Sequence, residues 1–345
     1  MKKNLLLLLS FCAFSIAATA QDFEDPGAYN TFINQQQERI TQKYLAYNSA
    51  VAHGRNAKKV EKQRTKLLDE VQEARMNISG MPSLQGYKAY RDSAVSFLKF
   101  YYNVLNEDYS KIVNMEEIAE QSYDLMEAYL LAQEKVDEKL GRANEMMKAE
   151  HQKFAEKFNM KLIEGDSETG KLSRKVSEIN NYHHKLYLIF FKSYKQELYL
   201  MEAIQKGNML GIEQNRSALS ATAKEGMEKL AGINAFDGDN NLVAATKTLL
   251  QFYQKEADQQ VPAITDFFLK KDRFETMKKE MDKKGSDRSK EDIDNYNKAV
   301  NDYNAAAKKF NESMNGLNKT KNDLLNDWNK AAASFLDEHT PKYKA

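Results

Sequence analysis

Apolar residues recur at alternating steps of three and four along the last part of the chain. These positions begin at Ile293 and end at Phe335. All of them are apolar except Lys321. A mean step close to 3.5 residues is typical of a coiled-coil-like seam along one face of a helix. The pattern therefore predicts a single helix of about 50 residues. Ser289 followed by Asp292 predicts a capping box at its start.

A second long stripe, with a slightly larger step, extends from Leu125 to Phe158. Only four prolines interrupt the chain, and the intervals between them are rich in residues that favour helices. No stretch alternates between apolar and polar residues with the period of two that is typical of a strand. We therefore expect an all-α fold.

Glycines mark two loops that lie 152 residues apart. Gly80 and Gly86 bracket the first loop, and Gly232 and Gly238 bracket the second. Several apolar positions on either side of these loops recur at the same offset, which indicates an internal duplication.

The duplication predicts two tandem helical units, residues 28–163 and 171–338, joined by a linker at residues 164–170. Short connections favour antiparallel neighbours, so we expect elongated antiparallel bundles that contain long coiled-coil-like helices. The second unit is longer than the first because of a charged insertion near residues 270–288.

Glycines also predict where the first helix of each unit ends. Gly54 and Gly207 are candidates for left-handed C-caps, and Asn208 can cap the helix that follows Gly207. The middle helix of the first unit contains FLKFYYNVL at residues 97–105, which is apolar around much of its circumference. A helix of this kind is expected in the centre of a bundle.

The first residues have the pattern of a secretory signal peptide. A basic start precedes an apolar run, and small residues precede Gln21. We expect residues 1–20 to be removed by cleavage between Ala20 and Gln21. The single cysteine, Cys12, would leave with them, so the exported chain would depend on packing rather than on disulfides.

Composition indicates a soluble globular protein, because 42% of the 345 residues are hydrophobic and 29% are charged. The chain has 51 basic and 50 acidic side chains, and loss of Lys2 and Lys3 leaves 49 basic ones. Such a balance gives no attraction to nucleic acid or anionic lipid. After the signal pattern no apolar stretch approaches the length of a membrane span. We therefore expect no nucleic-acid partner and no transmembrane segment in the mature chain.

Three histidines are the first candidates for chemistry. His183 and His184 are adjacent, so on a helix they point about 100° apart and cannot easily bind one metal. We interpret them as a capped or half-buried pair. His151 lies within an apolar stripe, where it is either a buried titrating group or, as we prefer, a core histidine with a satisfied hydrogen bond.

One carboxylate stripe could in principle hold a cation, but a solvated helix face explains it better. The stripe consists of Glu117, Glu120, Asp124 and Glu127. The chain contains no glycine-rich phosphate loop, nucleophile elbow or Cys/His nucleophile pair. We therefore expect a protein that is not an enzyme and that has no cofactor or metal.

Several segments carry a resemblance to a known family. They are DPGAYN at residues 25–30, NEDYSKIVNMEEIAEQSYDLMEAYLLAQEK at residues 106–135, YHHKLYLIFFKSYKQELYL at residues 182–200 and IEQNRSAL at residues 212–219. Together with the signal pattern, they resemble an uncharacterised family of exported helical surface proteins of Gram-negative bacteria. The resemblance implies export and a helical architecture. It supplies no activity and no binding residue.

Two functions are consistent with these features. The preferred one is a non-enzymatic cell-envelope protein of the periplasm or cell surface, which acts as a helical spacer or as a module that binds an envelope or surface protein. The alternative is a membrane-acting protein of the long-helix, pore-forming kind, with residues 186–191 as the inserting element. That run is flanked by Lys185 and Lys192 and is far shorter than the roughly 20 residues of a membrane span.

Overall fold

The computed structural model describes residues 23–53, 57–112, 123–162 and 167–344, with the backbone alone at residues 57, 107–112, 123–138 and 140. These residues are helical or lie in turns and loops, and none of them forms a strand. In chain order the helices are α1 (Pro26–His53), α2 (Ala57–Ser79), α3 (Ala89–Ile112), α5 (Tyr123–Lys157), α6 (Glu168–Gln205), α7 (Met209–Ala231), α8 (Asn241–Lys255), η1 (Glu256–Gln260), α9 (Val261–Lys284) and α10 (Lys290–His339).

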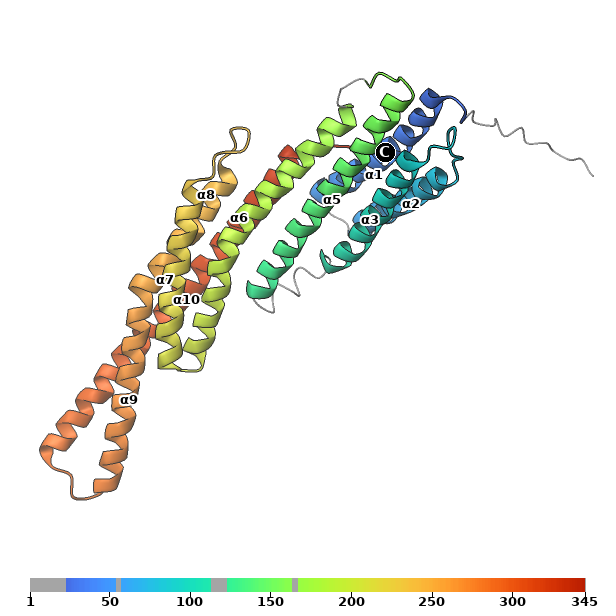
Figure 1. Cartoon of the computed structure of the whole chain (residues 1–345). Coiled ribbons are helices and arrows are strands. Elements are labelled where there is room, and N and C mark those ends of the chain that lie inside the picture. Colours follow the sequence, from blue (N-terminus) through green and yellow to red (C-terminus); the bar gives the residue numbers. More distant parts are fainter. Residues whose placement is uncertain (1–22, 54–56, 113–122, 163–166, 345) are drawn as a thin grey trace, which may run out of the picture.

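The helices form two bundles in an elongated molecule (Figure 1). The N-terminal bundle consists of α1, α2, α3 and α5, and the C-terminal bundle is built from α6, α7, α8 and α10. Each bundle has its own apolar cluster, which extends from Tyr29 to Phe154 in the first and from Ile179 to Phe335 in the second. None of the helices among the described residues is long and apolar enough to span a membrane.

Helix α6 belongs to both bundles. It begins after Ser167, whose hydroxyl accepts a hydrogen bond from the amide of Gly170 at 3.1 Å. The helix therefore starts inside the segment that the sequence predicted as a linker. Near its start Thr169 donates to Glu38 of α1 at 2.7 Å, and further along Lys192 pairs with Glu225 of α7 at 2.7 Å.

The aromatic core of the C-terminal bundle surrounds Trp328 of α10. The ring of Phe190 lies 4.4 Å from that of Trp328, and the indole nitrogen donates to Thr246 Oγ1 at 3.0 Å. Leu186 and Phe191 are also buried in this core. The apolar run at residues 186–191 thus faces the interior of the protein.

Local signals in the sequence predicted several helix ends correctly. Helix α10 spans 50 residues, and Ser289 and Asp292 form the expected capping box. Gly207 has a left-handed φ of 62°, and the side chain of Asn208 caps α7 by accepting from the amide of Gly211. Gly54 and the signal pattern at residues 1–20 lie outside the described residues.

Two turns with the same backbone conformation lie 152 residues apart. Leu84 exchanges two backbone hydrogen bonds with Tyr87, and Phe236 exchanges two with Asp239. The two residues inside each turn have positive φ, as a type I′ turn requires. Their φ values are 49° at Gln85, 81° at Gly86, 50° at Asp237 and 89° at Gly238.

A π-helical turn, η1, joins α8 to α9 without a break in the helix. The amide of Val261 donates to the carbonyl oxygen of Glu256, five residues back. Pro262 follows directly and has no amide to donate, and in a regular α-helix its ring would clash with the carbonyl of Asp258. The wider turn places this proline without a sharp kink, and π turns of this kind often occur at functional sites.

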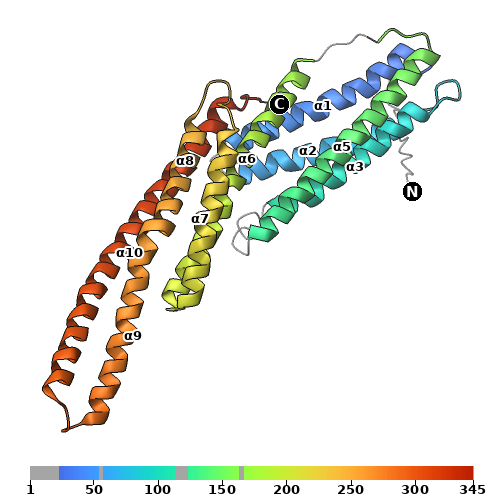
Figure 2. The same cartoon turned by 60° about the vertical axis from the view of Figure 1, so that its left-hand side comes forward.

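Helix α9 and the first part of α10 extend beyond the bundle as a hairpin, which we call the α9–α10 arm, residues 265–310 (Figures 1 and 2). Aromatic rings join its two helices. Phe267 lies 4.4 Å from Phe310, and Phe274 lies 5.0 Å from Tyr303, measured between ring centroids. The charged insertion predicted near residues 270–288 lies toward the tip of the arm.

Phe191→Asp should destabilise the protein strongly, because it places a carboxylate in the core of the C-terminal bundle. We expect the free energy of unfolding in urea to fall by at least about 3 kcal/mol. The matched control is Leu269→Asp at a side chain that is 60% exposed, where a change below about 0.5 kcal/mol is expected. Equal stabilities of the two variants would contradict the burial of Phe191.

Candidate functional site

Four ionisable side chains from four helical elements meet inside the C-terminal bundle, and we call them the carboxylate cluster. They are Glu197 of α6, Tyr253 of α8, Glu256 of η1 and Lys321 of α10. Glu197 and Tyr253 are fully buried, Glu256 is 1% exposed, and the Lys321 side chain is 13% exposed. Ionisable groups at such depth are uncommon unless they are paired, so the cluster is a candidate functional site.

Only part of the cluster is paired. Lys321 Nζ lies 2.7 Å from Glu197 Oε1. In contrast, Glu197 Oε2, Glu256 Oε2 and the Tyr253 hydroxyl have no hydrogen-bond partner among the described residues. A buried polar atom without a partner costs about 1–3 kcal/mol. These three atoms therefore lower the free energy of unfolding.

Burial of the carboxylate cluster favours the protonated forms of its acidic side chains. Burial, with a further contribution from the charge of Glu197, raises the pKa of Glu256 to about 8. Burial also raises the pKa of Glu197, although Lys321 opposes that shift. Burial raises the pKa of Tyr253 as well. At neutral pH Glu256 therefore holds a proton next to the Glu197–Lys321 pair, and the chemistry available to the cluster is the uptake and release of that proton.

Sequence reasoning did not find this cluster. One signal was present, because Lys321 is the single polar residue in the apolar seam of α10. A charge at a seam position requires a partner in the interior, but the sequence does not show which acids supply it. Glu197 and Glu256 come from α6 and η1, and only the packing of the bundle brings them to Lys321.

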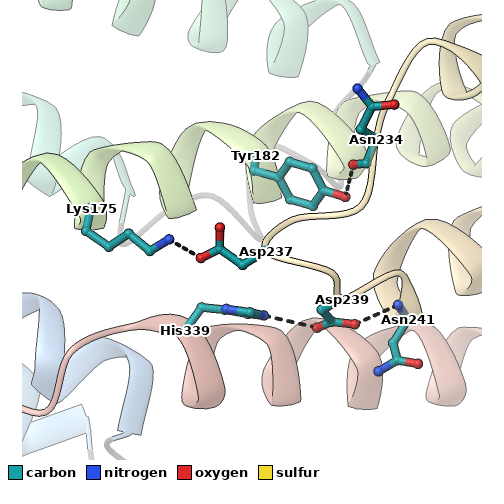
Figure 3. A network of polar contacts seen from close by, with 7 residues as sticks. All are labelled: Lys175, Tyr182, Asn234, Asp237, Asp239, Asn241 and His339. Carbon is teal, nitrogen blue, oxygen red and sulfur yellow. Dashed lines mark hydrogen bonds and ion pairs between the residues drawn. The ribbon is translucent and has the colours of Figure 1, made fainter.

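A second polar network holds the loop between α7 and α8 against α6 and the end of α10 (Figure 3). Lys175 of α6 pairs with Asp237, and the Tyr182 hydroxyl donates to the carbonyl oxygen of Asn234 at 2.9 Å. The Lys175 ammonium also lies 4.5 Å from the centre of the Phe236 ring. The hydrogen bond from Lys175 lowers the pKa of Asp237.

The same network contains the donor atoms of a possible metal site. Asp239, Glu338 and His339 each offer one ligand atom, and these atoms lie within 4.8 Å of one another. An imidazole with two carboxylates suits zinc and related ions. However, Asp239 already accepts a hydrogen bond from the amide of Asn241 at 2.8 Å and contacts His339 Nε2 at 3.2 Å. These contacts join Asp239 and His339 as a clamp on the loop, and Glu338 is exposed.

The C-terminal residues connect the two bundles. Nδ1 of His53, at the end of α1, lies 2.7 Å from Asp337 Oδ1, and its Nε2 lies 3.0 Å from the carbonyl oxygen of Thr340. The amide of Tyr343 donates to the Ser49 hydroxyl at 3.0 Å. Residues 45–50 of α1 are all buried, and α1 packs against α2, α6 and α10.

The histidines predicted from sequence occupy structural positions. His183 and His184 are half-buried in the middle of α6, and burial lowers the pKa of His183 to about 4. His151 stacks on Tyr90 with 4.8 Å between ring centroids, but its buried Nε2 has no hydrogen-bond partner among the described residues, so the predicted satisfied hydrogen bond is not found at this atom. The carboxylate stripe at residues 117–127 lies outside the described side chains.

Comparison with known proteins gives no match to a family model, to a curated protein sequence or to a solved structure. The family resemblance of the sequence therefore stays a prediction.

Glu256→Gln should make the stability of the protein less dependent on pH between about 4.5 and 8. The folded-state pKa of Glu256 is raised, so the stability that its protonated form provides is complete below about 4.5 and is lost as the pH rises toward about 8. A shift of this size corresponds to roughly 3–5 kcal/mol. Urea unfolding of the wild type at pH 5 to 9 should show this loss, and the Gln variant should lose less than half as much.

Asp258→Asn is the matched control, because Asp258 lies in the same π turn but is exposed. This variant should retain the pH dependence of the wild type. If Glu256→Gln and Asp258→Asn lose stability equally across this pH range, Glu256 does not titrate as described.

His53→Leu should release the C-terminal residues from α1. It removes two hydrogen bonds that together are worth about 1–3 kcal/mol, so hydrogen exchange at the amides of residues 340 and 342–344 should become faster. Asp337→Asn weakens only one of the two contacts and should have a smaller effect. Unchanged exchange in both variants would show that His53 does not hold this segment.

Proposed function

We propose that this protein is an exported, non-enzymatic cell-envelope protein that acts in the periplasm or at the cell surface as a helical spacer or protein-binding module. The signal pattern of residues 1–20 and the family resemblance support export. The observation that carries the binding role is the α9–α10 arm, which extends beyond the bundle and presents two long helical faces to its surroundings (Figure 2).

The apolar seam of the arm is only partly covered. Phe267, Phe274 and Tyr303 are half-buried because two helices cannot enclose a seam between them. Leu269 is 60% exposed and Ile293 is 43% exposed. Leu269 lies about 200° around α9 from Phe267, so it faces away from the seam, whereas Ile293 belongs to the seam. A partner helix laid against the outer side of α9 would cover Leu269, and helical partners commonly bind through such apolar contacts.

We also infer that the two bundles are tandem copies of one unit, with residues 28–163 and 171–338 as their bounds. The matching turns at Leu84–Tyr87 and Phe236–Asp239 support this inference, because each follows the second helix of its bundle at the same offset. The coiled-coil-like arm is then an addition to the second copy.

No observation favours the membrane-acting alternative. Its inserting element would be the run at residues 186–191, and Leu186, Phe190 and Phe191 of that run are buried around Trp328. Exposing them would require the C-terminal bundle to open.

Site-specific photocrosslinking tests the role of the arm. A photoreactive residue at Leu269 should capture the same partner reproducibly from envelope extracts. The same residue at Met76, which is 59% exposed on the N-terminal bundle, is the matched control and should not capture it.

Shortening the arm provides an independent check. Residues 272–305 are replaced by a short Gly-Ser turn, which keeps the Phe267–Phe310 contact at the base of the arm. The shortened protein should stay folded and lose the partner. Equal capture from both crosslinking positions, or capture that survives the shortening, would contradict binding through the arm.

A further inference from the structure

A cavity of about 590 Å³, open to solvent on one side, lies between helices of the N-terminal bundle and the start of α6. Its walls come from α1, α3, α5 and the first turns of α6. Clefts that hold small molecules usually have volumes of about 300–1,000 Å³. The cavity is therefore large enough for a ligand, whereas a second hollow, between α6 and α7, measures only about 110 Å³.

Helix α3 supplies most of the apolar wall. Phe97, Tyr101, Val104 and Leu105 line the cavity, and the rings of Phe97 and Tyr101 are stacked at 6.0 Å. The cavity explains why α3 is apolar around much of its circumference although most of its apolar side chains at residues 97–105 are only half-buried. Leu98 is buried in the bundle core and also borders the cavity, as do the four other apolar side chains of α3 named above.

The polar part of the lining is uncharged. It consists of amides and hydroxyls, including those of Gln37, Asn144 and Ser177, and no charged side chain lines the cavity among the described residues. Gln37 Nε2 has Met147 sulfur as a partner at 3.2 Å. A thioether is a weak acceptor, so this amide gains a stronger hydrogen bond when a ligand oxygen replaces the sulfur.

Contacts outside the cavity fix the positions of the helices that form its walls. Glu38 of α1 accepts from Thr169 of α6 at 2.7 Å. Tyr29 of α1 stacks on Phe154 of α5 at 5.6 Å between ring centroids. A cavity with walls fixed in this way is formed before a ligand arrives, which lowers the entropic cost of binding.

We propose that this cavity binds an uncharged small molecule with a mainly apolar body and one hydrogen-bonding group that reaches Gln37 or Asn144. An ion would lose part of its hydration in the cavity without finding an opposite charge among the described lining residues. The apolar walls instead favour a ring system or an acyl chain. This small-molecule site goes beyond the proposed protein-binding role and does not depend on it.

Titration of the purified protein with N-phenyl-1-naphthylamine, an uncharged fluorescent probe, tests the site. Apart from neighbouring residues of their own helices, no heavy atom of the described residues lies within 4 Å of a Cβ added at Gly141 or Gly316, so either position has room for a side chain. Gly141 lines the cavity, and Gly316 lies exposed on α10. Gly141→Phe should weaken probe binding at least tenfold, and Gly316→Phe should leave it unchanged.

Competition between decan-1-ol and decanoate at pH 8 tests the chemical class. The two have the same chain length and differ in charge, so the alcohol should displace the probe at a concentration at least tenfold lower than the acid. Equal displacement by the two would overturn the assignment of an uncharged ligand.

A second variant keeps the outcome clear if Gly141→Phe does not fold. Ser177→Phe fills the cavity from α6, the opposite wall, at an exposed position. It should also weaken binding of the probe at least tenfold. Undiminished binding in a folded variant of either position would mean that the probe binds elsewhere, and the proposal would fail.

Discussion

The packing of α6 against both bundles is the constraint on which the rest of the structure depends. The start of this helix is fixed to α1 by the hydrogen bonds of Thr169 with Glu38, and its later turns pack against α7 and α8. Because one rigid helix belongs to both groups, the orientation of one bundle determines that of the other. The clamp of the α7–α8 loop on Lys175 and Tyr182 and the contact of His53 with the C-terminal residues fix this orientation further.

The two bundles use their interiors differently. In the C-terminal bundle, aromatic rings around Trp328 fill the core, and the carboxylate cluster brings ionisable groups inside it. In the N-terminal bundle, an aromatic group that includes Tyr29 and Phe154 closes one region and the cavity remains open beyond it. If the bundles are copies of one unit, the two copies differ in their interiors. The second contains the carboxylate cluster, and the first contains the cavity.

The π turn η1 lies between α8 and α9, which have different positions in the fold. Helix α8 must pack within the bundle, whereas α9 must continue outward as one half of the arm. Pro262 prevents regular helical hydrogen bonding at this point, and the wider turn accommodates it while Glu256 stays buried next to Glu197. The root of the arm is thus also the place where the bundle buries a carboxyl group whose pKa is raised to about 8.

The sequence by itself determined the features that depend on a few neighbouring residues. The extent of α10, the capping box of Ser289 and Asp292, the left-handed Gly207 and the cap by Asn208 are local backbone interactions, so spacing alone predicted them. The apolar period of α3 showed that much of its surface avoids water, but not what lies against it. Tertiary structure decided that part of this surface borders a cavity, that α6 begins within the predicted linker, and that Glu197, Glu256 and Lys321 meet. The physical reason is that periodicity records which side chains leave water, whereas their partners come from helices far away in the chain and are set only when the bundles pack.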